Sequence, residues 1–258
     1  MVTGEPEADL LLPALADGIG AALTPEPQLL GLYLYGSLAT GDFTPGVSDV
    51  DLLAVTDGPI TPDVIGRLRP MHAAIECRFP HWHDRIEVIY VSQQELATFR
   101  THNHDIGVIS PGEPLHILSA GIDWLMNWYQ VRHGGLVVLG PEADAYVPDT
   151  TVEEYVTAVR AHAASFGEWM PEMRSARQQS YAILTLCRAL FTARHGYGTS
   201  KLAAAAWLAA EVPQYAPLLE RSLRWRESAP TDPALAEETY PDTLRFVQAM
   251  QVAIAETP

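Results

Sequence analysis

One stretch, residues 36–51, constrains this chain more than any other. It begins with Gly36-Ser37 and ends with Asp49-Val50-Asp51, and a short apolar run lies on each side of it (29–35 and 52–55). Such runs, rich in strand-forming residues and bounded by Gly, Pro or Asp, predict a strand, a turn, a loop and a second strand. Alternate residues of a strand share a face, so we expect Asp49 and Asp51 to project side by side.

The chemistry of this stretch points to a metal-bound phosphate. Two adjacent carboxylates repel each other unless a cation lies between them. Oxygen ligands suit Mg²⁺, which keeps several waters and takes further ligands from substrate phosphates. The Gly36-Ser37 turn would let a backbone approach closely and would offer N–H groups and a hydroxyl to a phosphate. By itself, however, an Asp-Val-Asp sequence is also typical of two solvated aspartates in a hairpin loop.

The spacing of these residues adds a resemblance. Gly-Ser, eleven residues and then Asp-Val-Asp resemble the signature of the DNA-polymerase-β-like nucleotidyltransferase superfamily. In that superfamily a third carboxylate comes from a neighbouring strand, and Glu87 stands in the apolar run 85–91, where a charge is out of place. In the aminoglycoside adenylyltransferases that this chain resembles, the matching glutamate is thought to be the general base on the acceptor hydroxyl. Nearby carboxylates and apolar neighbours would raise its pKa, as that role requires.

The resemblance therefore implies that Asp49, Asp51 and Glu87 are the catalytic and metal-binding residues. For Glu87 the structural alternative is an exposed strand glutamate or an ion-pair partner of Arg85.

The charge balance bears on the partner. The chain has 16 Lys and Arg against 32 Asp and Glu, a formal net charge of −16. That field repels a nucleic-acid backbone and attracts cations. It disfavours a polymerase or tRNA-modifying enzyme and favours a polycationic small molecule as acceptor, so we expect no nucleic-acid partner.

Cysteine use and hydropathy indicate the compartment. Cys77 and Cys187 are far apart and form no CxxC pair, which favours a reducing environment. The N-terminus carries Glu5, Glu7 and Asp9 instead of a basic leader, and no apolar run approaches the ~18 residues of a membrane span. We expect a cytoplasmic protein without membrane contact, as a monomer or weak dimer.

The pattern of elements changes along the chain. Strands alternate with helices as far as about residue 145, which predicts an α/β nucleotidyltransferase domain over 1–145, a mixed sheet flanked by helices. Beyond it, residues 150–258 read as an all-α helical bundle, the domain that would bind substrate and ATP phosphates. The expected strands are 29–35, 52–55, 85–91 and 136–139, with helices at 9–23, 63–79, from Ser92, and 121–133, and a loop over 100–116. The expected C-terminal helices are 151–170, 175–195, 200–211, 214–226 and 233–256.

The C-terminal half carries a second resemblance. Leu184-Thr185-Leu186-Cys187-Arg188, then Gly196, Thr199-Ser200-Lys201 and Ala206-Trp207, resemble the helical domain of streptomycin/spectinomycin adenylyltransferases. An arginine and a lysine with this separation reach the ATP phosphates in that family, which implies this role for Arg188 and Lys201. Ser200 has the character of an N-cap, and a bound phosphate would offset the unfavourable position of Lys201 at the helix N-terminus. An interhelical ion pair for Arg188 and a solvated side chain for Lys201 are the alternatives.

The resemblance also implies the remaining ATP contacts. These come from Gly36, Ser37 and Ser48, and from Trp225, which follows the segment where the family carries an aromatic that stacks on adenine. For Trp225 the alternative is an ordinary core tryptophan.

The acceptor side departs from the family. Enzymes that act on streptomycin have a tryptophan about 25 residues after the base, and residues 110–114 contain none. They also carry acids just before the arginine helix, and the stretch 168–178 here has basic or amide residues where those acids would be expected. These departures weaken the expectation of streptomycin as acceptor. Trp169 matches a family tryptophan approximately, and Glu113, Asp123 and Glu172 are candidate cation ligands, each with surface solvation as the alternative.

Two histidine pairs, His81/His83 and His102/His104, stand in segments read as loops. They lack the spacing of a closed zinc site.

The resemblance implies Mg²⁺-dependent transfer of AMP from ATP to a hydroxyl of an aminoglycoside-type antibiotic, with release of pyrophosphate and with two Mg²⁺ ions. Three alternatives stay open. The same fold would serve another small acceptor such as a lincosamide, it would adenylylate a protein or extend RNA, or it would bind nucleotide without catalysis.

Overall fold

The computed structural model describes residues 3–257, and the chain divides into two compact units, Met1–Thr150 and Thr151–Pro258. The first unit runs α1 (Pro6–Leu23), β1 (Leu29–Tyr35), α2 (Gly36–Thr40), β2 (Val50–Thr56), α3 (Pro62–Arg78), β3 (Ile86–Ser92), α4 (Gln93–Thr98), β4 (His104–Ser110), β5 (Glu113–Ala120), α5 (Leu125–Gly134) and β6 (Leu136–Leu139). The second runs α6 (Val152–Trp169), α7 (Ala176–His195), α8 (Lys201–Glu211), α9 (Ala216–Glu227) and α10 (Pro233–Ala255). Short 3₁₀ turns connect several of these elements.

The strands of the first unit form a single mixed sheet in the order β5-β4-β3-β2-β1-β6. Neighbours pair antiparallel except β2 and β3, which are parallel. Parallel neighbours need a long crossover connection, and α3 lies within it. The α/β class predicted for this half is therefore confirmed.

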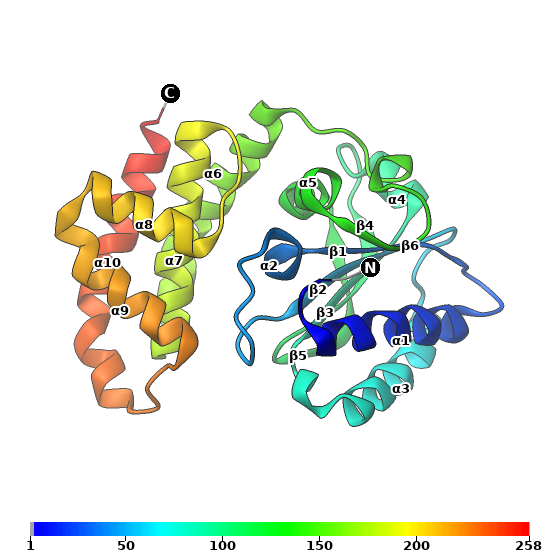
Figure 1. Cartoon of the computed structure of the whole chain (residues 1–258). Coiled ribbons are helices and arrows are strands. Elements are labelled where there is room, and N and C mark those ends of the chain that lie inside the picture. The colour runs from blue at the N-terminus through cyan, green and yellow to red at the C-terminus, as the bar shows by residue number, and fades with distance from the viewer. Residues whose placement is uncertain (1–2, 258) are drawn as a thin grey trace. The chain divides into compact units, whose positions relative to one another are not determined.

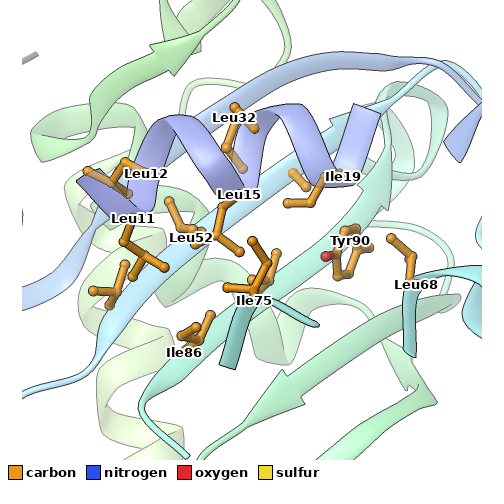
Figure 2. Close-up of a cluster of buried hydrophobic side chains, with 14 of the residues drawn as sticks. Leu11, Leu12, Leu15, Ile19, Leu32, Leu52, Leu68, Ile75, Ile86 and Tyr90 are labelled. Carbon is orange, nitrogen blue, oxygen red and sulfur yellow. The ribbon is translucent and has the colours of Figure 1, made fainter. Parts of the chain in front are cut away.

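Helices cover both faces of this sheet, with α1 and α3 on one face and α4 and α5 on the other (Figure 1). The core beneath α1 and α3 draws alternate residues from the central strands, namely Leu32, Leu34, Leu52, Ala54, Val88 and Tyr90 (Figure 2). Because side chains alternate across a strand, the intervening residues Tyr35, Asp51 and Glu87 project to the face that α5 covers.

The second unit is helical throughout its regular structure, as the sequence predicts. Its central helix is α7, whose residues are mostly buried and which packs against α6, α8, α9 and α10. The helix ends are marked in the sequence: Thr151 and Ser175 each form a capping box, Ser200 accepts a hydrogen bond from the N–H of Ala203, and Gly196 ends α7 in the left-handed region.

One segment of the predicted pattern is wrong. The sequence predicts a loop over residues 100–116, but 104–110 and 113–120 are the strands of a hairpin, β4 and β5. The turn between them contains Pro111-Gly112, and Gly112 has φ +80°. The histidines, prolines and glycines of this segment concealed the apolar residues Ile106, Val108 and Leu115, which are buried.

Among residues 3–257, no helix combines the length and the apolar character needed to cross a membrane.

A buried histidine lies under the sheet in the first unit. His72 of α3 is 3% exposed, and its Nε2 lies 2.6 Å from the hydroxyl oxygen of Tyr90. Burial lowers the pKa of His72 from its ordinary 6.5 to about 4. The unfolded chain therefore binds this proton more readily than the folded chain. The contribution of His72 to stability is complete above pH 6.5 and is lost as the pH falls toward 4, by up to about 3 kcal/mol.

We expect His72→Gln to flatten the acid side of the stability profile, because glutamine keeps a polar partner for Tyr90 but takes up no proton. The measurement is the free energy of unfolding by urea at pH 8, 6.5, 5 and 4. The variant should be less stable at pH 8 and should lose less stability between pH 6.5 and 4. The exposed His81→Gln is the matched control and should keep the wild-type profile. Equal slopes for His72→Gln and wild type would contradict this account.

Candidate active site

A row of polar side chains crosses the sheet on the face that α5 covers. Strand pairing places Tyr35 of β1 opposite Asp51 of β2, and Asp51 beside Glu87 of β3. Ser110, at the end of β4, forms a side-chain hydrogen bond with Glu87 and pairs with Glu113 of β5. The fold therefore brings together residues from five strands that are distant in the sequence.

Glu87 is held in this row by two hydroxyls. The hydroxyl of Tyr35 lies 3.1 Å from Glu87 Oε1, and Ser110 is its second partner. Burial raises the pKa of Glu87, and the charges of Asp49 and Glu113 raise it further, while the two hydrogen bonds act in the opposite direction. A carboxylate with a raised pKa beside other carboxylates has the properties of a general base.

Arg85, the alternative partner of Glu87, is engaged elsewhere. Its guanidinium donates to the backbone carbonyls of His81 and Ser48, and it lies 4.8 Å from the centroid of the Trp82 ring. Burial lowers the pKa of Arg85, while the charge of Asp49 acts to raise it. Arg85 therefore anchors the loop that leads into β2.

The two aspartates lie at the start of β2, beneath the turn that follows β1. Asp49 immediately precedes the strand and Asp51 is its second residue, and both are half-buried. Gly36 has φ +70°, and a Cβ built on it would lie 1.9 Å from Asp51 Oδ2. Only glycine lets the backbone approach this carboxylate so closely. The turn itself is a short helix, α2, in which Gly36 and the half-buried Ser37 are the first two residues.

Ser48 already has a structural task. Its side chain is buried, its Oγ accepts a hydrogen bond of 3.0 Å from the N–H of Thr44, and its carbonyl accepts from Arg85. Ser48 thus stabilises the loop 44–48, and its contact with a nucleotide stays a prediction.

The donor set suits a magnesium ion that is shared with a substrate. Asp49, Asp51 and Glu87 supply only oxygen atoms, and the Gly36 backbone borders the Asp51 carboxylate. Within residues 3–257, no three His, Cys, Asp or Glu side chains are close enough to hold a metal ion by themselves. Mg²⁺ in phosphate-transfer enzymes is commonly held by one or two carboxylates, waters and substrate phosphates. The residues present therefore fit a cation of this kind, and do not form a closed cage.

In the second unit, Arg188 and Lys201 lie near a cluster of rings. Arg188 of α7 is half-buried, and its Nε is buried without a hydrogen-bond partner. Burial lowers the pKa of His162, and the charge of Arg188 lowers it further. Lys201 is the first residue of α8, with its Nζ 5.4 Å from the ring centroid of Tyr181. The ring of Trp169, which is 39% exposed, lies 5.4 Å from that of His162.

Two other predicted residues fare differently. Glu172 is exposed in the 3₁₀ turn after α6. Trp225 is 6% exposed, and the guanidinium of Arg221 lies 5.1 Å from its ring centroid. This burial favours the core role for Trp225 and leaves little of its ring open, and its stacking on adenine stays a prediction.

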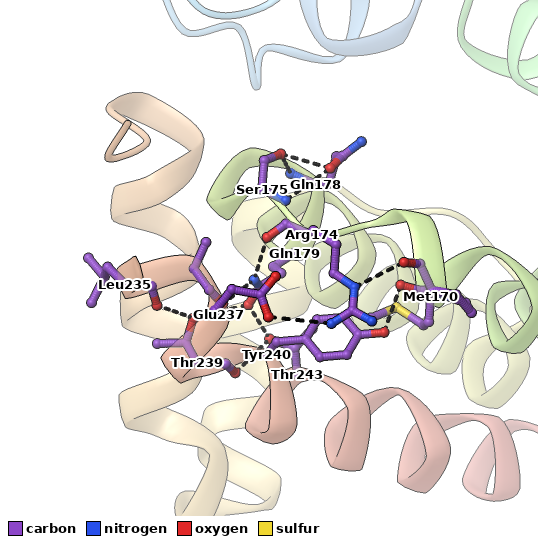
Figure 3. A network of polar contacts seen from close by, with 12 residues as sticks. Met170, Arg174, Ser175, Gln178, Gln179, Leu235, Glu237, Thr239, Tyr240 and Thr243 are labelled. Atoms are coloured by element: carbon purple, nitrogen blue, oxygen red, sulfur yellow. Dashed lines mark hydrogen bonds and ion pairs between the residues drawn. The ribbon is translucent and has the colours of Figure 1, made fainter. Parts of the chain in front are cut away.

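The basic residues found where the family has acids include a structural one. The Arg174 guanidinium lies 3.9 Å from the ring centroid of Tyr240 and 3.5 Å from the Glu237 carboxylate, and its Nε donates to the Pro171 carbonyl (Figure 3). Beside it, the buried side chain of Gln179 makes hydrogen bonds to both α10 and the Arg174 carbonyl. Arg174 therefore stabilises the packing of α10 against the segment before α7.

The sequence does not point to Tyr35, Ser110 and Asn127, which the structure connects to Glu87 directly or through one hydrogen bond. The side-chain nitrogen of Asn127, on α5, donates to the Tyr35 hydroxyl at 3.3 Å. Tyr35 directly precedes Gly36, but in the sequence it is only one more residue of an apolar strand. Its contact with Glu87 on β3 crosses the intervening strand β2.

Comparisons with known proteins agree with this fold. Residues 23–117 match the family model described as "Nucleotidyltransferase domain", and residues 147–252 match "Aminoglycoside adenylyltransferase, C-terminal domain". No curated protein sequence matched the chain. Among solved structures, the spectinomycin adenyltransferase AAD(9) from Enterococcus faecialis, determined with ATP and spectinomycin, matches with a TM-score of 0.76 and 17% identity. The alignment covers 96% of this chain and 99% of that one.

At 17% identity the structural likeness shows a shared fold, and the family models carry the assignment further. The first model matches within the first unit, and the second begins four residues before the second unit and covers most of it, in the order expected for a catalytic domain followed by an adenylyltransferase helical domain. The chain thus belongs to the aminoglycoside nucleotidyltransferases, enzymes that transfer nucleotidyl groups.

Proposed function

We propose that this enzyme transfers AMP from ATP to a hydroxyl of an aminoglycoside-type antibiotic and releases pyrophosphate, with two Mg²⁺ ions. The observation that carries the proposal is the alignment of Asp51 and Glu87 on adjacent parallel strands, with Asp49 just before and Gly36 packed against Asp51. The adenylyltransferase model in the second unit supports the acceptor class. The solved relative, which was crystallised with ATP and spectinomycin, supports both substrates.

In this mechanism Asp49 and Asp51 would hold Mg²⁺, with Glu87 as the third carboxylate nearby. When bound, the metal supplies charge neutralisation at the phosphates. The Gly36 and Ser37 turn binds phosphate oxygens, and Arg188 and Lys201 bind the β- and γ-phosphates and orient them. Glu87 takes the proton of the acceptor hydroxyl while the hydroxyl oxygen forms its bond to the α-phosphorus. The bond between the α-phosphorus and the bridging oxygen then breaks, and pyrophosphate leaves.

The acceptor is a cation in this proposal. The formal charge of −16 favours its approach and disfavours a nucleic acid. Glu113 lies near enough to Glu87 to raise its pKa, which suits a carboxylate that meets the acceptor. Trp169 and Glu172 are the acceptor candidates of the second unit. We place the reaction in the cytoplasm, where ATP is present and where Cys77 and Cys187 stay unpaired as they are here.

Pyrophosphate release tests the reaction and the acceptor together. We expect release with Mg²⁺ and ATP in the presence of at least one of spectinomycin, streptomycin and a kanamycin-type compound, and least with streptomycin. ATP binding is measured in parallel. ATP binding without release on the whole panel would overturn the antibiotic acceptor and turn the search to lincosamides, proteins and other hydroxylated acceptors. Release that depends on RNA would overturn the small-molecule assignment.

Substitution of two carboxylates separates metal binding from proton removal. Glu87→Gln should keep ATP affinity and lose transfer by at least ~10²-fold, because only the base is removed. Asp49→Asn should abolish transfer and weaken the dependence of ATP binding on Mg²⁺. The measurements are single-turnover rates and ATP dissociation constants with and without Mg²⁺. If Glu87→Gln loses ATP affinity instead, Glu87 is a metal ligand; unimpaired turnover of Asp49→Asn would exclude it as one.

The close approach of Gly36 to Asp51 gives a matched pair of variants. Gly36→Ala and Gly41→Ala both place a side chain at positive φ, at +70° and +77°, so each carries a similar strain of about 1–2 kcal/mol. Only at Gly36 would the Cβ overlap the Asp51 carboxylate, since nothing lies within 4 Å of a Cβ on Gly41. Displacement of Asp51 should lower transfer by roughly 10²-fold in Gly36→Ala. Equal rates for the two variants, measured at matched folded concentration, would contradict this reading.

A further inference from the structure

The hydroxyl of Tyr35 occupies an unusual position for a strand tyrosine. Its side chain is 4% exposed, and the hydroxyl lies between Glu87 on β3 and Asn127 on α5, at 3.1 and 3.3 Å. A tyrosine hydroxyl has one hydrogen to donate and can also accept, so it can connect these two partners.

The direction of these hydrogen bonds follows from chemistry. The amide nitrogen of Asn127 has only hydrogens to give, so it donates to the Tyr35 oxygen. An ionised carboxylate only accepts, so the single hydrogen of Tyr35 goes to Glu87 Oε1. The chain of donors therefore runs in one direction, from helix α5 through strand β1 to Glu87.

We propose that Tyr35 and Asn127 are positioning residues, which fix the orientation of the Glu87 carboxylate toward the acceptor hydroxyl. The inference rests on the proposed function, in which Glu87 is the base. The evidence for it is geometric: two hydrogen bonds in series that end on a Glu87 oxygen, on the face of the sheet that also carries Asp51.

The carboxylate needs such a restraint. The terminal torsion of a glutamate is broad and roughly two-fold, so packing of the stem alone does not set the plane of the carboxylate. Two ionised oxygens offer about four acceptor sites. Tyr35 and Ser110 occupy two of these acceptor sites. The remaining sites are free for the incoming proton, and the two hydrogen bonds keep the direction of those sites constant.

The same strand provides a matched control. Tyr33 is a buried tyrosine two residues before Tyr35, and its hydroxyl donates to the Pro141 carbonyl at 3.1 Å. Tyr33→Phe and Tyr35→Phe each remove one buried hydroxyl that makes a hydrogen bond, and only the second removes a partner of Glu87. A merely structural effect of losing a hydroxyl should be similar in the two variants.

The experiment measures single-turnover transfer and the ATP dissociation constant of each variant, with whichever acceptor supports turnover. We expect Tyr35→Phe to lower the transfer rate about 10-fold or more while ATP affinity stays within about twofold, since a misdirected base slows the chemical step. Tyr33→Phe should keep the wild-type rate. Asn127→Ala should act in the same direction as Tyr35→Phe, and should add little to it in the double variant.

The decisive arm uses the Glu87→Gln background. If Tyr35 acts through the Glu87 carboxylate, Tyr35→Phe should add little to the loss in Glu87→Gln, because the base is already gone. An undiminished effect in that background, or a wild-type rate for both Tyr35→Phe and Asn127→Ala, would overturn the inference and leave the proposed function intact. Full activity of Glu87→Gln itself would overturn the role of Glu87 in the proposed function, and the positioning role with it.

Discussion

The site depends on a pairing register that places carboxylates side by side. Asp51 and Glu87 are neighbours because β2 and β3 pair in parallel with Leu52 beside Val88. The side chains of Leu52 and Val88 belong to the core under α1 and α3. A shift of the strand register by one residue would turn them toward the other face of the sheet. The hydrophobic effect on one face of the sheet therefore fixes the position of the charges on the other.

This arrangement is unfavourable without compensation, since half-buried carboxylates close to one another repel. The compensation seen within the first unit is local and polar. Tyr35 and Ser110 donate to Glu87, and Arg85 offsets part of the charge of Asp49. In the proposed function a phosphate-bound cation would offset the remainder, and the carboxylates would then be best satisfied with substrate present. Strain of this kind is expected at functional sites and is tolerated because the surrounding core is well packed.

Much of this could be read from the sequence because it is local. The strand before Gly36, the capping boxes at Ser92, Thr151 and Ser175, and the N-cap at Ser200 all follow from short-range chemistry. The contact from Tyr35 to Glu87 joins residues 52 positions apart across an intervening strand, and no local pattern encodes it. The hairpin 104–120 was missed because its turn and histidines resemble a loop, and only its pairing partners make it a strand pair.

On the acceptor side, the role of Arg174 becomes clear only from the residues that it contacts in the structure. In the sequence, Arg174 is one of the basic residues in a stretch where the family carries acids. This departure argues against streptomycin as the acceptor and does not indicate another one. In the structure Arg174 stacks on Tyr240 and pairs with Glu237, so its charge is partly neutralised by α10 and serves the packing of that helix. A cationic acceptor must then find its negative partners elsewhere. Of the predicted acceptor carboxylates, Glu113 lies within electrostatic reach of Glu87, where the proposed reaction would bring the modified hydroxyl. Recognition in this enzyme would then depend more on the β4–β5 hairpin than on the segment before α7.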